Sequence, residues 1–284
     1  MESWKEGMID QILSSIRTYD NLVSKAQTIL TDSNGTAWGA ASTLSTVMKP
    51  FCYIIIGIIL LLELANVASK VDIIKWEHGL KVAIKVVLAR VCIDIAPTFL
   101  QACFNQANIW INSAASVGSE YTLTQLLSTQ IQQQLADVTG FFEILGIWIP
   151  TLLISFCVKA VSLFIQVVAF GRMFEVYLYF AVSPLPCAFF PLGDGSGGGM
   201  SRITQRFFKS FIAACLQGVM ILMSLRISNA ILGGTINEMV TAAVRLGGGM
   251  AVTEILWAVL LGGIVMASAV AKCGSWAKQI IDAA

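Results

Sequence analysis

The feature that most limits the fold is a series of long apolar segments with few charges. A transmembrane helix needs about 20 mostly apolar residues to cross a hydrocarbon core of about 30 Å. Hydrophobic residues make up 56% and charged residues 12% of the 284 positions, which leaves too little polar surface for a water-soluble domain. The sequence therefore predicts an all-α, polytopic bundle of membrane helices. The segments that predict spans are 50–68, 80–104, 141–168, 209–232 and 249–271.

The apolar run from Phe141 to Leu192 leaves the number of spans open between five and six. As one helix this run would be about 78 Å long, enough for two crossings. Pro184, Pro186 and Pro191 would break a continuous helix, because proline lacks a backbone donor and clashes with the preceding turn. One interpretation is a re-entrant or interfacial element over 170–192 that starts near Gly171 and Arg172. The other is an additional, proline-kinked span.

The distribution of basic residues predicts the orientation. Segment 105–140 contains no lysine or arginine, whereas 69–85 contains four lysines. Because cytoplasmic loops carry the Lys/Arg excess, 105–140 is predicted to be external and the N-terminus with it. Five spans place five further basic residues inside, whereas six spans place them outside. The rule therefore favours five spans, with the N-terminus out and the C-terminus in. The five residues are Arg202, Arg206, Lys209, Lys272 and Lys278.

The predicted regions follow from these boundaries. They are an external amphipathic helix and linker (1–48), the first two spans (49–104), an external loop (105–140), the rest of the bundle (141–272) and a cytoplasmic tail (273–284). The bundle includes the proline-broken element 170–192 and a glycine-rich loop over 193–199.

Two predicted helices outside the spans are amphipathic. The helix over 5–30 carries Ile9, Ile12 and Ile16 at near-helical spacing, so its apolar stripe must be buried on the lipid surface or on a partner. The helix over 121–136 repeats a leucine or isoleucine every four residues. It has no basic residues to hold anionic lipid, which favours a protein partner.

Charged residues in the predicted spans are candidate functional residues, because such a charge is costly unless it is paired. Arg90 and Asp94 are four residues apart, on one helix face. Arg226 and Glu254 are predicted to share a depth and to pair between helices. Two further charges, Lys159 and Glu63, fall toward the inner third and could pair likewise. Such pairs either hold the bundle together or face a hydrated conduit.

The last span contains a stripe of small residues. Gly263, Ala267 and Ala271 are each four apart, which lets two helix backbones approach closely. The stripe predicts a helix–helix contact, either within the subunit or between subunits.

The sequence predicts no catalytic residue, no metal site and no cofactor. Seven cysteines lie mostly in apolar segments without a CxxC pair, so they are interpreted as small buried residues. Gly193, Gly195 and Gly198 match GxGxxG, but no strand precedes them, and a flexible hinge is favoured. His78 stands in a charged loop without a nucleophile at suggestive spacing.

The stretch FGRMFEVYLYFAVSPLPCAFF (170–190) precedes a glycine loop and SRITQRFFKSFIAACLQGVMI (201–221). With the external helix, five spans and long external loop, it resembles the TrbL-type polytopic inner-membrane subunit of type IV secretion and conjugation systems, closest to the versions in Gram-positive conjugative elements. The resemblance covers roughly 40–275. Its strongest parts are Gly171, Arg172, Glu175, Pro184, Pro186 and the stretch from Phe207 to Gly218.

The resemblance implies a multi-pass channel or scaffold subunit of the cell membrane that is not an enzyme. Such a subunit would form a homo-oligomer, contact the system's ATPases and small bitopic membrane subunits, and help to pass single-stranded DNA with its attached relaxase. Element 170–192 would lie on the cytoplasmic side, anchored by Arg172 and Glu175. The alternative is a solute transporter, which the sequence disfavours because it has one broken segment and no matching repeat.

Overall fold

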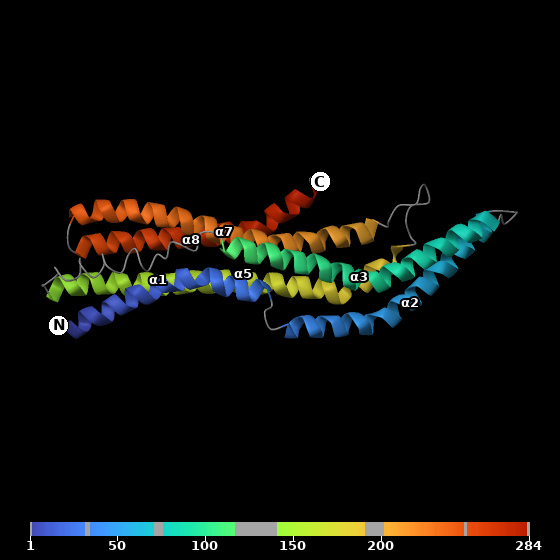
Figure 1. Cartoon of the computed structure of the whole chain (residues 1–284), viewed down its shortest axis with the longest axis horizontal. Helices are drawn as coiled ribbons and strands as arrows, with labels where there is room; N and C mark the ends of the chain where they lie inside the picture. Colours follow the sequence, from blue (N-terminus) through green and yellow to red (C-terminus); the bar gives the residue numbers. More distant parts are fainter. Residues whose placement is uncertain are drawn as a thin grey trace. The chain divides into compact units, whose positions relative to one another are not determined.

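The computed structural model is helical through the parts of the chain that it describes, which are 2–31, 35–70, 76–116, 141–190, 202–246 and 249–282 (Figure 1). This confirms the predicted all-α class. The helices are α1 (Glu2–Thr31), α2 (Thr36–Lys70), α3 (Trp76–Ser116), α5 (Phe141–Val182), α6 (Pro184–Ala188), α7 (Arg202–Leu246) and α8 (Gly249–Asp282).

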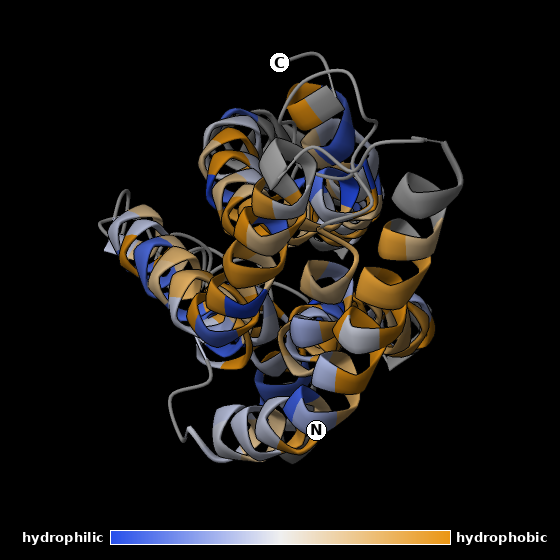
Figure 2. Cartoon of the chain, turned by 90° about the vertical axis from the view of Figure 1, so that its right-hand side faces the viewer, coloured by the Kyte–Doolittle hydropathy of each residue, from blue (hydrophilic) through white to orange (hydrophobic). Residues whose placement is uncertain are grey.

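The membrane character of the chain is confirmed by long apolar stretches in these helices. Four stretches, counted over the described residues, are long and apolar enough to span a bilayer. They are Ile9–Leu62, which includes parts of α1 and α2, and Gly146–Ala188, Arg202–Thr235 and Thr253–Ile281. The predicted span 80–104 falls in α3, which is not among them, and the charges that make it more polar include Lys85, Arg90 and Asp94. Hydrophobic residues predominate along many of the helices (Figure 2), and large apolar side chains such as Phe51, Phe156 and Leu261 are exposed. The chain is a polytopic membrane helix bundle, and the number and direction of its crossings stay predictions.

The helices extend beyond the predicted spans at several ends. α2 begins at Thr36, α3 continues to Ser116 inside the predicted loop, and α8 continues to Asp282 through the predicted tail. Once a helix has nucleated, each further residue adds a hydrogen bond, so polar residues do not stop it at a membrane surface. The rest of the predicted loop, with its helix over 121–136, lies outside the described residues, as does the glycine-rich loop 193–199.

α5 continues through Gly171 and Arg172, where the predicted re-entrant or interfacial element was to start. The helix runs without a break from Phe141 to Val182, about 63 Å at 1.5 Å per residue. It ends where the two closely spaced prolines remove donors. Pro184 has no N–H for the carbonyl of Phe180, which accepts instead from the Ser183 N–H at 3.2 Å, and Pro184 then opens α6. Isolated prolines inside α2, α3 and α5 do not end those helices.

Unit 1 of the two compact units in the chain comprises Met1–Thr31, Ile109–Gly171 and Gln217–Trp276. Its core includes the apolar stripe of α1, with Ile12, Ile16, Tyr19, Leu22 and Leu30 almost fully buried. The stripe that was predicted to lie on lipid or on a partner packs instead against helices of the same unit.

Named contacts show which helices cover that stripe. Tyr19 meets Gly263 of α8, and Leu30 and Ile111 both lie beside Gly218 of α7. The Gln27 side-chain amide donates to the Asn112 oxygen of α3 at 2.9 Å. α1 is therefore an integral helix of unit 1.

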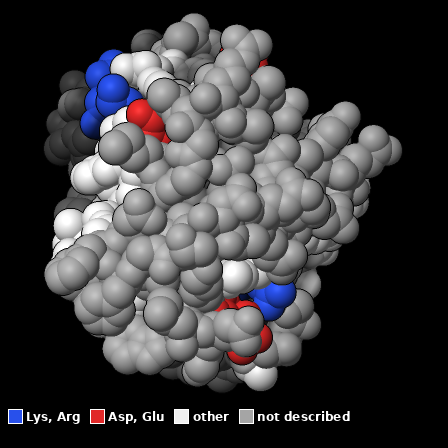
Figure 3. Space-filling model, turned by 90° about the vertical axis from the view of Figure 1, so that its left-hand side faces the viewer, with Lys and Arg blue, Asp and Glu red and all other residues white. Residues whose placement is uncertain are grey.

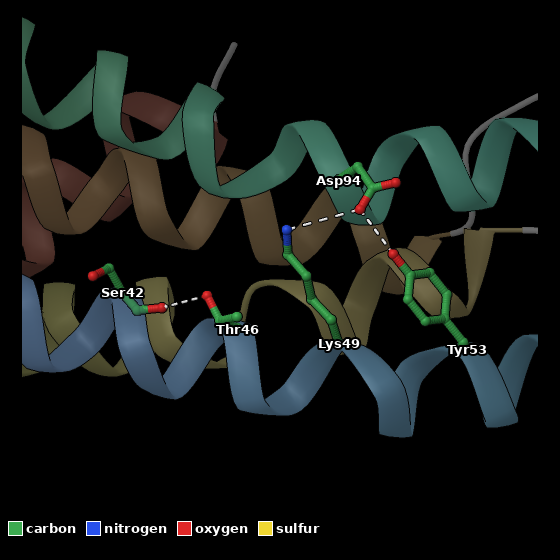
Figure 4. Close-up of polar contacts among 5 residues, drawn as sticks. All are labelled: Ser42, Thr46, Lys49, Tyr53 and Asp94. Carbon is green, nitrogen blue, oxygen red and sulfur yellow. Dashed lines mark hydrogen bonds and ion pairs between the residues drawn. The ribbon is translucent and has the colours of Figure 1, made fainter.

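Unit 2 comprises Asp32–Asn108, Arg172–Leu216 and Ala277–Ala284. Within it α2 runs beside α3 (Figures 1 and 4) and contacts α6. Trp38 of α2 stacks on Phe104 of α3, with ring centroids 4.7 Å apart, and packs on Phe180 of α5 at 4.1 Å. The Thr204 hydroxyl donates to the Pro186 carbonyl at 2.7 Å, which ties the start of α7 to α6.

Candidate functional site

Asp94 of α3 joins two side chains of α2. Lys49 Nζ lies 3.8 Å from Asp94 Oδ1, and the Tyr53 hydroxyl donates to the same oxygen at 2.8 Å (Figure 4). Lys49 and Tyr53 are four residues apart, so they lie on one face of α2 and reach the same carboxylate. We call Lys49, Tyr53, Arg90 and Asp94 the α2–α3 polar cluster.

Arg90 enters the cluster through the ring of Tyr53. Its guanidinium carbon lies 5.8 Å from the ring centroid, within the range of a cation–π interaction. The structure thus brings the predicted residues Arg90 and Asp94 together through a third residue: one lies over the face of Tyr53 and the other accepts from its hydroxyl. A tyrosine four residues from a lysine was the sequence signal that could have identified this site.

The polar cluster opens on an apolar surface. The side chain of Asp94 is 49% exposed and that of Lys49 27% exposed. Phe51 and Ile54 on α2 and Val91 on α3 are exposed on the same helices. An ion pair on such a surface would be costly against lipid, which favours water or another protein beside it.

The hydroxyl groups one and two turns before Lys49 are satisfied within α2. Thr46 donates its hydroxyl to the Ser42 carbonyl at 3.0 Å (Figure 4), and Ser42 donates its hydroxyl to the Gly39 carbonyl at 2.8 Å. This internal bonding lets small polar residues stand on a membrane helix without a partner from another helix.

Arg226 and Glu254, which were predicted to pair, are not brought together. The guanidinium of Arg226 donates instead to the carbonyl of Ala115, while Glu254 is exposed on α8. Ala115 is next to the last residue of α3, where carbonyls have no partner within the helix and a cation is favoured. This partner was missed because residues 105–116 were predicted to be loop.

The other predicted charges have different surroundings. Arg172 and Glu175 form an ion pair on α5, with 2.5 Å between the guanidinium and carboxylate atoms. Lys159 is exposed on α5, and the side chain of Glu63 lies outside the described residues. Their predicted pairing stays a prediction. Figure 3 shows one face of the molecule, where the described charged side chains form small separate groups.

The small-residue stripe contacts another helix of the same chain through its first member. Gly263 is buried, with Tyr19 in the place of a β-carbon, whereas Ala271 is exposed. The adjacent Gly262, outside the stripe, faces Leu232 of α7 in the same way, with Leu232 Cγ 2.7 Å from the β-carbon position. Two successive glycines of α8 therefore admit side chains from two helices.

No group of three or more His, Cys, Asp or Glu side chains that could hold a metal occurs where the structure describes side chains. Cys92 of α3 and Cys187 of α6 are free thiols that lie close to each other. The described charged and polar residues discussed here therefore form ion pairs, hydrogen bonds and helix contacts.

Comparison with known families decides the class of protein. Residues 25–184 match the family described as TrbL/VirB6 plasmid conjugal transfer like protein. This chain belongs to the TrbL/VirB6 family. The match includes the whole of the α2–α3 polar cluster, the Arg172–Glu175 pair and Pro184, and it ends before the stretch from Phe207 to Gly218. No curated protein and no solved structure matches the chain.

Membership of the TrbL/VirB6 family confirms the predicted resemblance and gives the coarse function. The chain is a membrane subunit of a type IV secretion or conjugation system, in a family of structural transfer subunits. Its long apolar helices make it a multi-pass protein of the inner membrane. Family membership also indicates that it interacts with other components of such a system.

Proposed function

We propose that this TrbL/VirB6 family subunit forms part of the membrane conduit that passes single-stranded DNA with its attached relaxase. In this proposal the chain crosses the membrane five times, with its N-terminus outside, and assembles with copies of itself. The observation that carries the proposal is the Lys49–Asp94 ion pair on the apolar α2–α3 surface, in which the Asp94 side chain is half exposed. Family membership favours a transfer subunit over the solute transporter that was the alternative.

The Lys49–Asp94 pair would be costly to leave against lipid. A charged side chain at the centre of a membrane helix costs at least about 2.5 kcal/mol. Asp94 is half exposed although it has two partners, so part of its carboxylate remains for water or for another molecule. A hydrated conduit bordered by several subunits would suit both the charged and the apolar side chains of this surface. Water would solvate the carboxylate, while neighbouring apolar side chains such as Ile54 would contact protein or lipid.

The partners of the conduit follow from the family and from the orientation. The system's ATPases would act from the cytoplasm and its small bitopic subunits would pack beside the bundle. Under the proposed orientation, the Arg172–Glu175 pair and α6 lie toward the cytoplasm, near subunit contacts or the entrance.

A transfer assay tests the proposal. A deletion strain is complemented with wild type, Asp94→Asn, Lys49→Gln or the exchanged pair Lys49→Asp/Asp94→Lys, and with Lys25→Gln as a matched loss of an exposed charge. We expect the single substitutions at the pair to lower transfer roughly tenfold or more, because each leaves an unpaired group in the membrane. The exchanged pair should recover part of the loss, and the membrane level of each variant is measured by immunoblotting.

The conduit role needs a second readout that assembly alone would not change. A photo-crosslinking amino acid placed at Ile95, an exposed position next to Asp94, should capture the transferred strand during mating. Capture at Ile95 and none at Lys25 supports the conduit. Normal transfer by Asp94→Asn, or no captured DNA at Ile95 during active transfer, contradicts it and leaves family membership unaffected.

A further inference from the structure

A pocket of about 330 Å³ lies between the start of α7 and the end of α8, within unit 2. The α7 residues that line it are spaced three and four apart, so they lie on one face of the helix. The two α8 residues are three apart, so they also share a face. The pocket is a gap between two helix faces, lined by Arg206, Lys209, Ser210, Ala213, Lys278 and Ile281.

Every described charged side chain that lines this pocket is basic. Arg206, Lys209 and Lys278 are all exposed, and none forms an ion pair with a described residue. The described residues that line the pocket include no carboxylate. Three cations around one cavity repel each other unless an anion lies between them, so the pocket is complementary to a compact, negatively charged group.

Its position on the two helices places it at the edge of the apolar stretches. Arg202, Arg206 and Lys209 precede the most apolar part of α7, and Lys272 and Lys278 follow that of α8, so both helices become more polar here. Exposed apolar side chains, Ile203, Ile212 and Ile280, stand on the same helix segments. Phospholipid head groups occupy this depth of a bilayer.

We infer that this pocket binds the phosphate-bearing head group of an anionic phospholipid. Arg206 can hold two phosphate oxygens with its planar fork, and Lys209 and Lys278 act as point charges. Ala213 and Ile281 provide an apolar wall for the first carbons of the lipid. Basic pockets between membrane helices suit such head groups. The inference goes beyond DNA passage and holds for either orientation of the chain.

Lipid binding by the purified full chain tests the inference. The protein is placed in nanodiscs of phosphatidylcholine, and binding of phosphatidylglycerol or cardiolipin is followed by native mass spectrometry. The pocket variant is Arg206→Gln/Lys209→Gln/Lys278→Gln. The control variant, Arg17→Gln/Lys25→Gln/Lys159→Gln, removes the same formal charge from exposed positions outside the pocket. We expect weakening of roughly fivefold for each cation, on the order of 100-fold for the pocket variant, and near wild-type binding by the control.

Further arms separate the sources of phosphate. Inorganic phosphate and a single-stranded oligonucleotide are added as competitors at equal phosphate concentration. Selective, pocket-dependent retention of anionic lipid supports the inference. Equal loss in both triple variants, equal affinity for phosphatidylcholine, or displacement of the lipid by either competitor overturns it. If the pocket variant does not fold by circular dichroism, Lys278→Gln against Lys278→Arg provides the same comparison, with weaker lipid binding expected only for glutamine.

Discussion

The ring of Tyr19 in α1 lies against the backbone of Gly263 in α8, where any side chain larger than hydrogen would collide with it. The tyrosine is almost fully buried, and its hydroxyl has no hydrogen-bond partner among the described atoms. This contact fixes α1 inside unit 1 and turns a small-residue motif into a specific meeting of two helices.

We therefore expect Gly263→Ala to destabilise the protein by about 1–3 kcal/mol, the usual effect of overpacking a core. Tyr19→Phe should be nearly neutral or slightly stabilising, because it removes a buried unsatisfied hydroxyl. In the double variant, Tyr19→Phe should recover part of the loss, because it removes the hydroxyl oxygen that collides with the new β-carbon. Recovery should be incomplete, because the ring carbon Cζ stays 2.8 Å from that β-carbon. Thermal unfolding in detergent measures all three proteins, and strict additivity would contradict the contact.

Arg226 should matter more than Glu254. Arg226 of α7 places its positive charge beside the last turn of α3. Replacing it with glutamine removes that charge and should lower the free energy of unfolding by about 1–2 kcal/mol. Glu254→Leu should change stability by less than about 0.5 kcal/mol, because the side chain is exposed. Unfolding midpoints of the two variants give the comparison. A larger loss for Glu254→Leu would restore the ion pair predicted from the sequence.

A cross-linker that reacts with thiols should join Cys92 to Cys187. Because they lie close to each other on α3 and α6, a short bifunctional thiol reagent should join them within one chain. The link appears as a fragment-size change after cleavage between the helices and electrophoresis. Cys92→Ser and Cys187→Ser should each abolish it, whereas Cys273→Ser should not. Linkage that persists in both single variants would show that other cysteines were responsible.

The orientation of the chain can be measured independently of its fold. In a cysteine-free background, Ser128→Cys in the predicted external loop should be labelled by an impermeant maleimide in intact cells. Lys278→Cys near the C-terminus should be labelled after lysis only. The opposite pattern would reverse the predicted orientation, and labelling of both positions in intact cells would favour an even number of spans.

Apolar patterning was sufficient to predict the class of fold and the existence of most helices, because long runs without charges have few other structures available. It did not predict where helices end. Residues 105–116 are polar enough to resemble a loop, yet α3 continues through them to Ser116. The break at Pro184 was predictable, since two missing donors within one turn cannot be tolerated as one can.

The sequence identified charged residues of the candidate site but not the groups that they contact. Arg90 and Asp94 were identified because charges in apolar segments are rare. Their shared partner Tyr53 lies on another helix, and only the register of α2 against α3 brings it there. Arg226 was likewise identified, but a backbone carbonyl leaves no sign in a sequence.

The half-exposed carboxylate of Asp94 should affect how long the protein persists in the cell. A copy synthesised without the other components would keep this carboxylate and Lys49 in unfavourable surroundings, which lowers its stability, and cells degrade the unfolded fraction of a marginally stable protein. Cells that lack the other components should therefore hold less of the chain, with a shorter half-life, and neutralising both residues together should lengthen it.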